Sequence, residues 1–251
     1  MLSAELWELG TAGIRELEYG ERVTLIAGFE TNDEREMLLR EFAAFAPEWE
    51  LEEAIDWVQW THDAWPARIV GERLFLAPPW SKEPTPEGRL RLVHNPGLAC
   101  GTGEHPCSQL ALSSLETVAL PDCRVLDVGT GSGILAIAAK LLGAGLVVGV
   151  DNDVTALQAA EENFALSHVE ALVVGGSTEA IAADQFEVTV ANISGTVLLS
   201  IFDDLLRVTR SGGRLILTGF AQWELAPFLD LLPGAAVWDM NEWRCVTATL
   251  C

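Results

Sequence analysis

From about residue 105 onward, two kinds of apolar pattern alternate along the chain. Short runs rich in apolar and β-branched residues, such as 146–151, predict buried strands, and apolar residues at helical spacing, as in 153–166, predict helices between them. This alternation predicts an α/β fold with a doubly wound, mostly parallel sheet of seven strands. The last two strands follow each other without a helix, which predicts an antiparallel hairpin at the sheet edge. The expected strands are 124–128, 146–151, 171–175, 186–192, 213–219, 235–240 and 244–250, and the expected helices are 107–119, 133–143, 153–166, 178–183, 196–209 and 222–231.

A smaller unit precedes this pattern. An apolar, β-branched run over 23–29 predicts a strand, and the apolar spacing that follows Asn32 or Asp33 predicts a helix that ends before Pro47. We therefore expect a small acidic α+β domain over residues 1–56.

The stretch 57–88 is predicted to connect the two domains. It begins as a tryptophan-rich helix in which Trp57 and Trp60 share one face, and we expect these rings to wedge between domains rather than to form an aromatic cage. A short strand over 73–77 and a proline-rich loop follow. The main domain is expected over 89–251, and its first strand is predicted at 90–94.

The charge of the chain is strongly acidic. It has 15 basic and 37 acidic residues, for a net charge of −22, and residues 1–56 hold 15 of the acidic and only 4 of the basic ones. Such a surface repels nucleic acid and attracts a basic protein. We expect no direct nucleic-acid contact and a basic protein partner recognised by the N-terminal domain; acidity that serves only solubility is an equal alternative.

The cysteines and the hydropathy of the chain argue against several classes of protein. The five cysteines form no Cys-x-x-Cys pair, which argues against a zinc site or a disulfide framework and fits a reducing cytosol. No apolar run approaches the roughly 20 residues of a membrane span, and the N-terminus has no signal-peptide pattern. We therefore expect a cytoplasmic monomer without a metal and without a membrane contact.

A glycine-rich turn joins the first strand of the regular pattern to its helix. The sequence 125–133 reads Val-Leu-Asp-Val-Gly-Thr-Gly-Ser-Gly, and such glycines let the backbone approach a ligand where a Cβ would collide. A dinucleotide site needs a glycine at the position that Ile134 occupies. The spacing instead resembles that of S-adenosylmethionine-dependent methyltransferases, with Gly129 and Gly131 against the cofactor.

Two carboxylates flank this turn. Asp151 ends the next strand, where one carboxylate can accept two hydrogen bonds from a ribose diol. Asp127 can face the methionyl ammonium, directly or through the loop. Asp153 is expected to cap the following helix.

A second glycine-rich turn indicates which family the chain resembles. Residues 95–108 read Asn-Pro-Gly-Leu-Ala-Cys-Gly-Thr-Gly-Glu-His-Pro-Cys-Ser. Together with Leu-Ala-Ile-Ala-Ala at 135–139, Val-Ala-Asn-Ile at 190–193 and Trp-Arg-Cys at 243–245, this turn resembles the PrmA family of bacterial ribosomal-protein lysine methyltransferases. The resemblance covers roughly residues 57–250. It implies a Rossmann-like methyltransferase sheet, S-adenosylmethionine as cofactor, and methyl transfer to lysine or N-terminal amines of a large-subunit ribosomal protein.

The family's functional residues map onto matching positions of this chain. The resemblance implies cofactor contacts at Ser108, Gly129, Asp151 and Asn192, and it places Thr102 with the Glu104–His105 pair in the loop that closes over the cofactor. We expect catalytic roles for Asn192, Thr102 and His105, with Thr102 also near the cofactor. Two alternatives stay open, because Asn192 can be a turn residue after a strand and His105 can be a cap before Pro106.

The chain also departs from the family pattern. Cys100 stands where the family commonly has phenylalanine, Cys107 and Ser108 replace threonines, and Ser194 replaces a leucine. Two alternative functions therefore stay open. One is a methyltransferase of small molecules, which would be favoured if residues 1–56 fold over the pocket. The other is a cofactor-binding module without catalysis.

A lysine acceptor makes a further demand on the pocket. With a reference pKa near 10.4, the lysine ammonium must lose its proton before it can attack a methyl group. We therefore expect an apolar immediate pocket formed by Leu98, Cys100 and Ile193, with the carboxylates lying further out.

Overall fold

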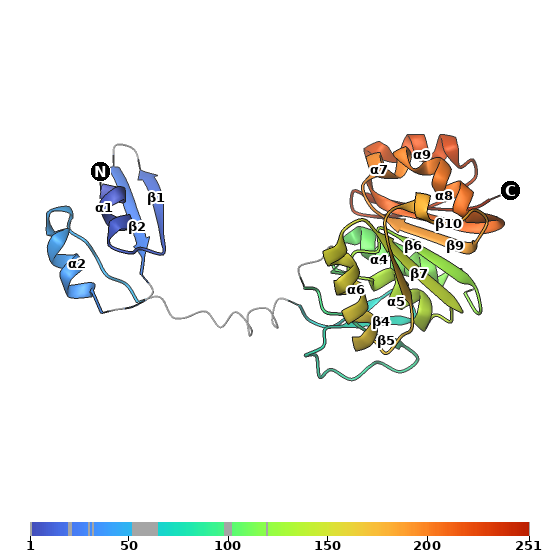
Figure 1. Ribbon diagram of the computed structural model, residues 1–251, viewed down its shortest axis with the longest axis horizontal. Coiled ribbons are helices and arrows are strands. Elements are labelled where there is room, and N and C mark those ends of the chain that lie inside the picture. Colours follow the sequence, from blue (N-terminus) through green and yellow to red (C-terminus); the bar gives the residue numbers. More distant parts are fainter. Residues whose placement is uncertain are drawn as a thin grey trace. The chain divides into compact units, whose positions relative to one another are not determined.

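The computed structural model describes residues 2–19, 22–29, 31, 33–51, 65–97, 102–118 and 120–250. It divides the chain into two compact units, Met1–Ile55 and Asp56–Cys251. The two units are drawn in Figure 1, and each is described here by itself. The predicted tryptophan-rich helix that begins at residue 57 falls outside the described residues.

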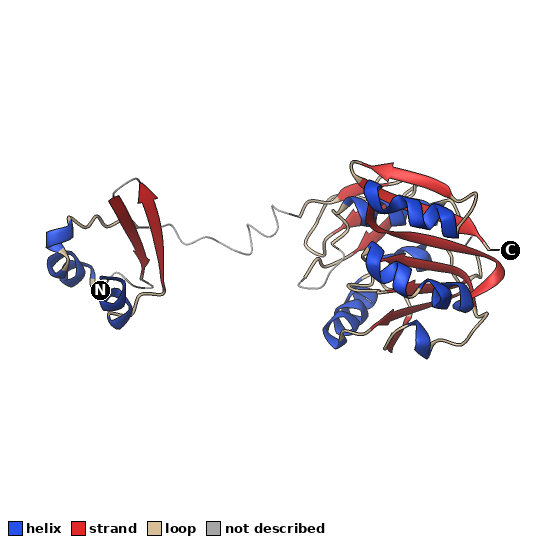
Figure 2. Ribbon diagram, turned by 90° about the horizontal axis from the view of Figure 1, so that it is seen from above, coloured by secondary structure: helices blue, strands red, loops and turns tan. Residues whose placement is uncertain are grey.

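The N-terminal unit is a β-hairpin covered by helices. Strands β1 (Gly13–Tyr19) and β2 (Arg22–Gly28) pair in antiparallel register. Helices α1 (Leu2–Glu8) and α2 (Arg35–Glu41) lie on the same side of this hairpin (Figure 2). A small core forms between helices and strands; its buried residues are Leu6, Leu38 and Phe42, and Leu25, Ala27, Phe29 and Trp49 pack against them.

The predictions for this unit are met in part. The strand expected over 23–29 is β2, and the expected helix is shorter, because α2 ends at Glu41 and continues only as a 3₁₀ turn, η1 (Ala43–Phe45). Ala46 then adopts a left-handed conformation (φ 51°) that ends the turn before Pro47. Helix α1 and strand β1 were not predicted, because charged residues interrupt the apolar spacing in both.

A three-stranded sheet opens the described part of the larger unit. Strand β3 (Arg68–Val70) is antiparallel to β4 (Leu74–Ala77), which is parallel to β5 (Leu90–Val93). The strands expected at 73–77 and 90–94 are therefore present, and part of the stretch expected to be a linker forms this sheet together with β5.

One carboxylate closes the turn between β3 and β4. Glu116, at the end of α4 (Pro106–Glu116), accepts the backbone N–H groups of Glu72 at 2.7 Å, Arg73 at 3.0 Å and Leu74 at 3.1 Å. Gly71 makes room for it, since a Cβ on this left-handed residue (φ 57°) would lie 2.4 Å from Oε2 of Glu116. The small sheet is thus tied to α4.

The seven-stranded sheet confirms the predicted doubly wound fold. Its strand order is β11-β12-β10-β9-β6-β7-β8, with β12 antiparallel to both of its neighbours and the other pairs parallel. The chain runs outward in one direction from β6 through β7 to β8 and in the other from β9 to β10, so the strand order reverses between β6 and β9. The strands are β6 (Arg124–Val128), β7 (Leu146–Asp151), β8 (Leu172–Gly175), β9 (Phe186–Asn192), β10 (Thr209–Ala221), β11 (Ala236–Met240) and β12 (Trp243–Thr249).

Helices cover both faces of this sheet (Figure 1). Alternate strand residues point to opposite sides, as Val125 and Leu126 illustrate by belonging to different core clusters. Helices α4, α5 (Ile134–Leu141) and α6 (Val154–Leu166) pack on one face. Helices α7 (Gly195–Ser200), α8 (Phe202–Val208) and α9 (Leu225–Leu231) pack on the other.

Some predicted helices differ in detail. The single helix expected over 196–209 is two helices, α7 and α8, because Ile201 leaves helical geometry (φ −109°, ψ 14°). The helix expected at 178–183 is a 3₁₀ turn, η2 (Thr178–Ala180), and the one expected at 222–231 begins as a 3₁₀ turn, η3 (Gln222–Glu224), before α9. No helix in the described part of the chain is both long and apolar enough to cross a bilayer.

The hydrogen bonds of Glu116 yield a prediction about stability. In Glu116→Gln an amide NH₂ replaces one accepting oxygen, so at least one backbone N–H loses its partner, and we expect the free energy of unfolding to fall by about 2 kcal/mol. Urea denaturation followed by circular dichroism measures the change. The control is Glu162→Gln on the exposed side of α6, and equal stabilities of the two variants would contradict the role of Glu116.

Candidate functional site

A cavity of about 700 Å³ lies at the carboxyl ends of the central strands. Its lining includes Val128 at the end of β6, Asp151 at the end of β7 and Asn192 at the end of β9. These strands flank the point at which the strand order reverses, the usual ligand position in a doubly wound sheet. The other lining residues are Thr102, His105, Ser108, Gly129, Thr130, Gly131, Ile134, Leu135, Val150, Asn152, Gly176, Ser177, Thr178, Ile193, Ser194, Val197 and Ile201.

Most predicted site residues meet in this cavity. Asp127 is the exception, and two residues expected in the acceptor pocket, Leu98 and Cys100, lie outside the described part of the chain. The predicted residues that line the cavity are Thr102, His105, Ser108, Gly129, Gly131, Asp151, Asn192 and Ile193.

The glycine turn between β6 and α5 has two roles. Gly129 has a left-handed backbone (φ 69°), and a Cβ there would lie 2.4 Å from Cγ2 of Ile193 in the cavity wall. Gly133 (φ 81°) lets α5 begin against α6, since its Cβ would lie 2.7 Å from Cε1 of Phe164. The backbone N–H groups of Gly129 and Thr130 donate to the carbonyl of Val150, which fixes the turn on β7. Glycine therefore allows the backbone to lie close to Ile193 at one end of the turn and to Phe164 at the other.

Asp127 supports the turn from behind. Its side chain is 0% exposed, and its Oδ2 accepts the hydroxyl of Thr130 at 2.7 Å and the N–H of Ala136 at 3.1 Å. Burial raises the pKa of this carboxyl to about 7, against the opposing effect of the two hydrogen bonds. The side chain does not line the cavity, so of its two expected modes of action the geometry favours the one through the loop.

Asp151 presents a fixed carboxylate at the cavity. Its Oδ2 accepts the N–H of Gly131 at 2.9 Å, and its Oδ1 accepts the N–H of Asp153 at 3.0 Å. Each carboxylate oxygen retains acceptor capacity, as a ribose diol requires. Asp153 caps α6, as expected, by accepting the N–H of Thr155 at 2.8 Å.

Asn192 at the end of β9 and Ser108 on α4 form a hydrogen-bonded pair at the cavity. They are 84 residues apart in sequence, and Nδ2 of Asn192 donates to Oγ of Ser108 at 3.2 Å. Asn192 ends β9, and Ser108 lies in the first turn of α4. The two residues expected to contact the cofactor thus hold each other in place at the cavity.

His105 combines a structural role with a place in the lining. It is the N-cap of α4, where its Nδ1 accepts the N–H of Cys107 at 3.3 Å. Its ring meets the Trp243 ring edge to face, with centroids 4.5 Å apart. His105 therefore acts as the helix cap that was one of its two expected roles. Because Nδ1 is used for the cap, Nε2 is the ring nitrogen left for a ligand.

The loop before α4 is anchored at its C-terminal end. Gly103 is left-handed (φ 80°), and a Cβ there would lie 2.3 Å from Leu76 and 2.7 Å from Ile134. Glu104 forms an ion pair with Arg68, and its carbonyl accepts a hydrogen bond from Gln109 at 2.8 Å. Partial burial lowers the pKa of Arg68. These contacts position Thr102 at the cavity edge.

The sequence did not reveal a buried polar network beneath the glycine turn. Asn163 on α6 accepts the N–H of Asn95 at 2.8 Å and donates to the carbonyl of Ser132 at 2.9 Å. His94 places its Nε2 2.8 Å from Oγ of Ser132, and burial lowers the pKa of this histidine to about 4. The available signal was a polar residue, Asn163, on the apolar side of a predicted helix.

The cavity residues fit the S-adenosylmethionine that the sequence led us to expect. Gly129 and Gly131 leave room for a ligand against the backbone, and Asp151 matches a diol. Thr178 is 1% exposed, and its hydroxyl has no hydrogen-bond partner among the described residues, which suits a polar ligand group. Within the described residues, no group of three or more His, Cys, Asp or Glu side chains is placed to hold a metal ion.

Comparisons with known proteins point in the same direction. The family model described as ribosomal protein L11 methyltransferase (PrmA) matches residues 5–250. The protein of that name from Methylobacillus flagellatus is 44% identical over 164 residues, which cover 65% of this chain and 55% of the relative. Its counterpart from Burkholderia ambifaria is 38% identical over 198 residues, 77% of this chain and 65% of the relative. The chain thus spans between 55% and 65% of the length of these relatives.

Solved structures give the same fold. The ribosomal protein L11 methylase of Lactobacillus delbrueckii subsp. bulgaricus superposes with a TM-score of 0.68 at 28% identity, covering 74% of this chain and 100% of that one. A 16S rRNA N2 G1207 methyltransferase of T. thermophilus gives a TM-score of 0.54 at 22% identity, covering 63% of this chain and 46% of that one. The second likeness concerns the fold alone.

The buried carboxyl of Asp127 yields a pH prediction. Its folded-state pKa is raised, so it stabilises the fold at low pH, and this contribution is lost as pH rises through about 7. Asp127→Asn keeps an acceptor for Thr130 and Ala136 but does not ionise. We expect the free energy of unfolding of this variant, relative to the parent, to increase from pH 4.5 to pH 8.

Urea denaturation across that pH range measures the difference. The control is Asp230→Asn, an exposed residue on α9, whose difference from the parent should not change in this way. Parallel stability curves for Asp127→Asn and the parent would refute a raised pKa at Asp127.

Proposed function

The chain belongs to the ribosomal protein L11 methyltransferase (PrmA) family, and from this premise we propose that it methylates amines of a large-subunit ribosomal protein, L11, with S-adenosylmethionine as cofactor. The observation that carries the proposal is the meeting of Asp151, the Gly129–Gly131 turn and the Asn192–Ser108 pair around one cavity.

The proposed roles of the residues follow from their positions. When bound, the cofactor supplies an electrophilic methyl group on a sulfonium. Asp151 accepts hydrogen bonds from the ribose hydroxyls, and Gly129 and Gly131 let the backbone lie against the ligand. We propose that Asn192, held by Ser108, aligns the acceptor nitrogen, and such positioning contributes several kcal/mol to lowering a barrier.

The lining also suits a neutral amine. A lysine loses its proton more easily where its charged form is poorly solvated. Ile193, Val197 and Ile201 supply apolar surface, and Asp151 is the one carboxylate in the described lining. Because both of its oxygens already accept backbone N–H groups, it stabilises a nearby ammonium less than a free carboxylate would. This supports the expectation that the other carboxylates lie further out.

The charge of the chain supports a proposal for its partner, and its cysteines support one for its location. A net charge of −22 favours approach of a basic ribosomal protein and disfavours direct contact with RNA. We propose that the acidic N-terminal unit recognises this partner, and that the protein acts as a monomer in the cytoplasm. Of its cysteines, Cys107 and Cys245 are buried and form no disulfide, in keeping with a reducing compartment.

The first test is methylation itself. Incubating the protein with labelled S-adenosylmethionine and unmethylated L11 should label L11, and mass spectrometry should locate the methyl groups on amines. Asp151→Ala should lose cofactor affinity by at least tenfold in calorimetry, because the diol loses its acceptor. The matched control is Asp153→Ala, which removes only a helix cap and should retain affinity.

Each other outcome has a defined meaning. Cofactor binding without label on L11, but with turnover of a small amine, would support the small-molecule alternative. Binding without any turnover would support a module without catalysis. Unchanged affinity of Asp151→Ala would refute the site assignment.

A second prediction concerns the Asn192–Ser108 pair. Asn192→Ala should lower kcat by about tenfold or more, because the acceptor loses a positioning group. Ser108→Ala should lower it less, since Asn192 remains but is held less firmly. The double variant should be no worse than Asn192→Ala alone, because the residues act as a unit. Multiplicative losses in initial-rate kinetics would show that the two residues act independently.

A further inference from the structure

One wall of the cavity is formed by the turn that follows β8. Gly176 and Ser177 line the cavity directly before the 3₁₀ turn η2, and Thr178, the first residue of η2, lines it with them. The N–H of Gly176 donates to the carbonyl of Asp151 at 2.9 Å, so this wall begins beside the predicted ribose contact. Its position therefore affects the nucleoside end of the cavity.

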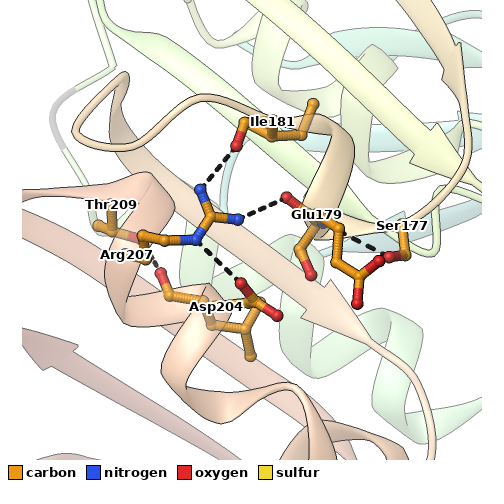
Figure 3. Close-up of polar contacts among 8 residues, drawn as sticks. Ser177, Glu179, Ile181, Asp204, Arg207 and Thr209 are labelled. Carbon is orange, nitrogen blue, oxygen red and sulfur yellow. Dashed lines mark hydrogen bonds and ion pairs between the residues drawn. The ribbon is translucent and has the colours of Figure 1, made fainter.

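Arg207 holds this turn from the side of α8 (Figure 3). Its Nη2 donates to the carbonyl of Thr178 and its Nη1 to the carbonyl of Ile181, both at 2.8 Å. Its Nε donates to Oδ1 of Asp204 at 2.9 Å, which orients the guanidinium from one turn earlier on the same helix. A planar guanidinium can serve three acceptors at once, whereas a lysine cannot reproduce this geometry.

Thr178 connects this clamp to the cavity. Its carbonyl is bound by Arg207, its side chain is 1% exposed, and its hydroxyl lacks a hydrogen-bond partner among the described residues. A buried hydroxyl in a ligand-lining position is normally satisfied when the ligand is present. A shift of the Thr178 backbone would move this hydroxyl together with the wall.

We propose that Arg207 is a positioning residue for the nucleoside end of the cofactor site. It acts through the carbonyls of Thr178 and Ile181, and it sets where the Gly176–Thr178 wall and the Thr178 hydroxyl stand relative to Asp151. This inference rests on the proposed function, because it assigns to the cavity a nucleoside-containing cofactor.

A purely structural role would have different consequences. A cation in the last turn of α8 also interacts favourably with the helix dipole, and that contribution affects stability alone. Arg207→Lys separates the two roles, since it keeps the charge near Asp204 and the helix end but cannot bind both carbonyls. Arg210→Lys is the matched control, because Arg210 pairs with Glu187 on β9, at the end of the sheet opposite the cavity.

Calorimetry on the full chain tests the proposal with two probes, S-adenosylhomocysteine and 5′-methylthioadenosine; the latter lacks the amino-acid end. Arg207→Lys should raise the Kd for both by about tenfold, with kcat at saturating cofactor within about twofold of the parent. Thr178→Val should have a similar effect, and the double variant should lose less than the product of the single losses. Arg210→Lys should retain the parent's Kd.

The opposite results overturn the proposal. An unchanged Kd in folded Arg207→Lys, or a loss for S-adenosylhomocysteine but not for 5′-methylthioadenosine, would exclude positioning of the nucleoside end. If Arg207→Lys fails to fold, Asp204→Ala replaces it, because it removes the acceptor that orients Nε of Arg207, and a Kd equal to that of the parent excludes the proposal. If the parent binds neither probe, the proposed function fails, and this inference fails with it.

Discussion

The site depends on a contact between the two glycine-rich turns of the chain. Asn163 joins the start of the upstream loop, at Asn95, to Ser132 in the second turn, and His94 reaches the same serine. Asn163 is 2% exposed, so its amide replaces solvent for backbone groups that would otherwise be buried unpaired. The start of the upstream loop and the second glycine turn are therefore held together by these buried side chains.

The ionisable groups around this contact are largely neutralised or restrained. Burial lowers the pKa of His94 to about 4, so it is uncharged near neutral pH, and burial raises that of Asp127 to about 7. The pH dependences of stability from these two groups oppose each other between about pH 4 and 6.5: stability from His94 grows with pH, and stability from Asp127 declines. Because the two contributions oppose each other, the stability of the glycine turn changes little over this pH range.

Much of this arrangement followed from sequence, because apolar periodicity and glycine spacing are local signals. Strands β6, β7 and β9 have the predicted boundaries, since each is rich in apolar and β-branched residues and lies between turn residues. The prediction of one helix over 196–209 was wrong because the break at Ile201 serves packing on the sheet, which no local signal encodes. Asn163 and Arg207 were missed for the same reason: the backbone groups that they bind lie at least 26 residues away along the chain.

A contrast between long-range and short-range effects also bears on the charge of the protein: under the proposed function, an acidic chain has to give an amine a site that favours its neutral form. Long-range attraction depends on total charge, whereas the protonation state of a buried amine depends on the groups within a few ångströms of it. Here Asp151, the one carboxylate in the described cavity lining, already accepts two backbone N–H groups, and Glu104 before α4 is paired with Arg68. Acceptors that are satisfied internally stabilise an incoming ammonium less, so under the proposed function an acidic chain can attract a cation over distance and still favour its neutral form at the cavity.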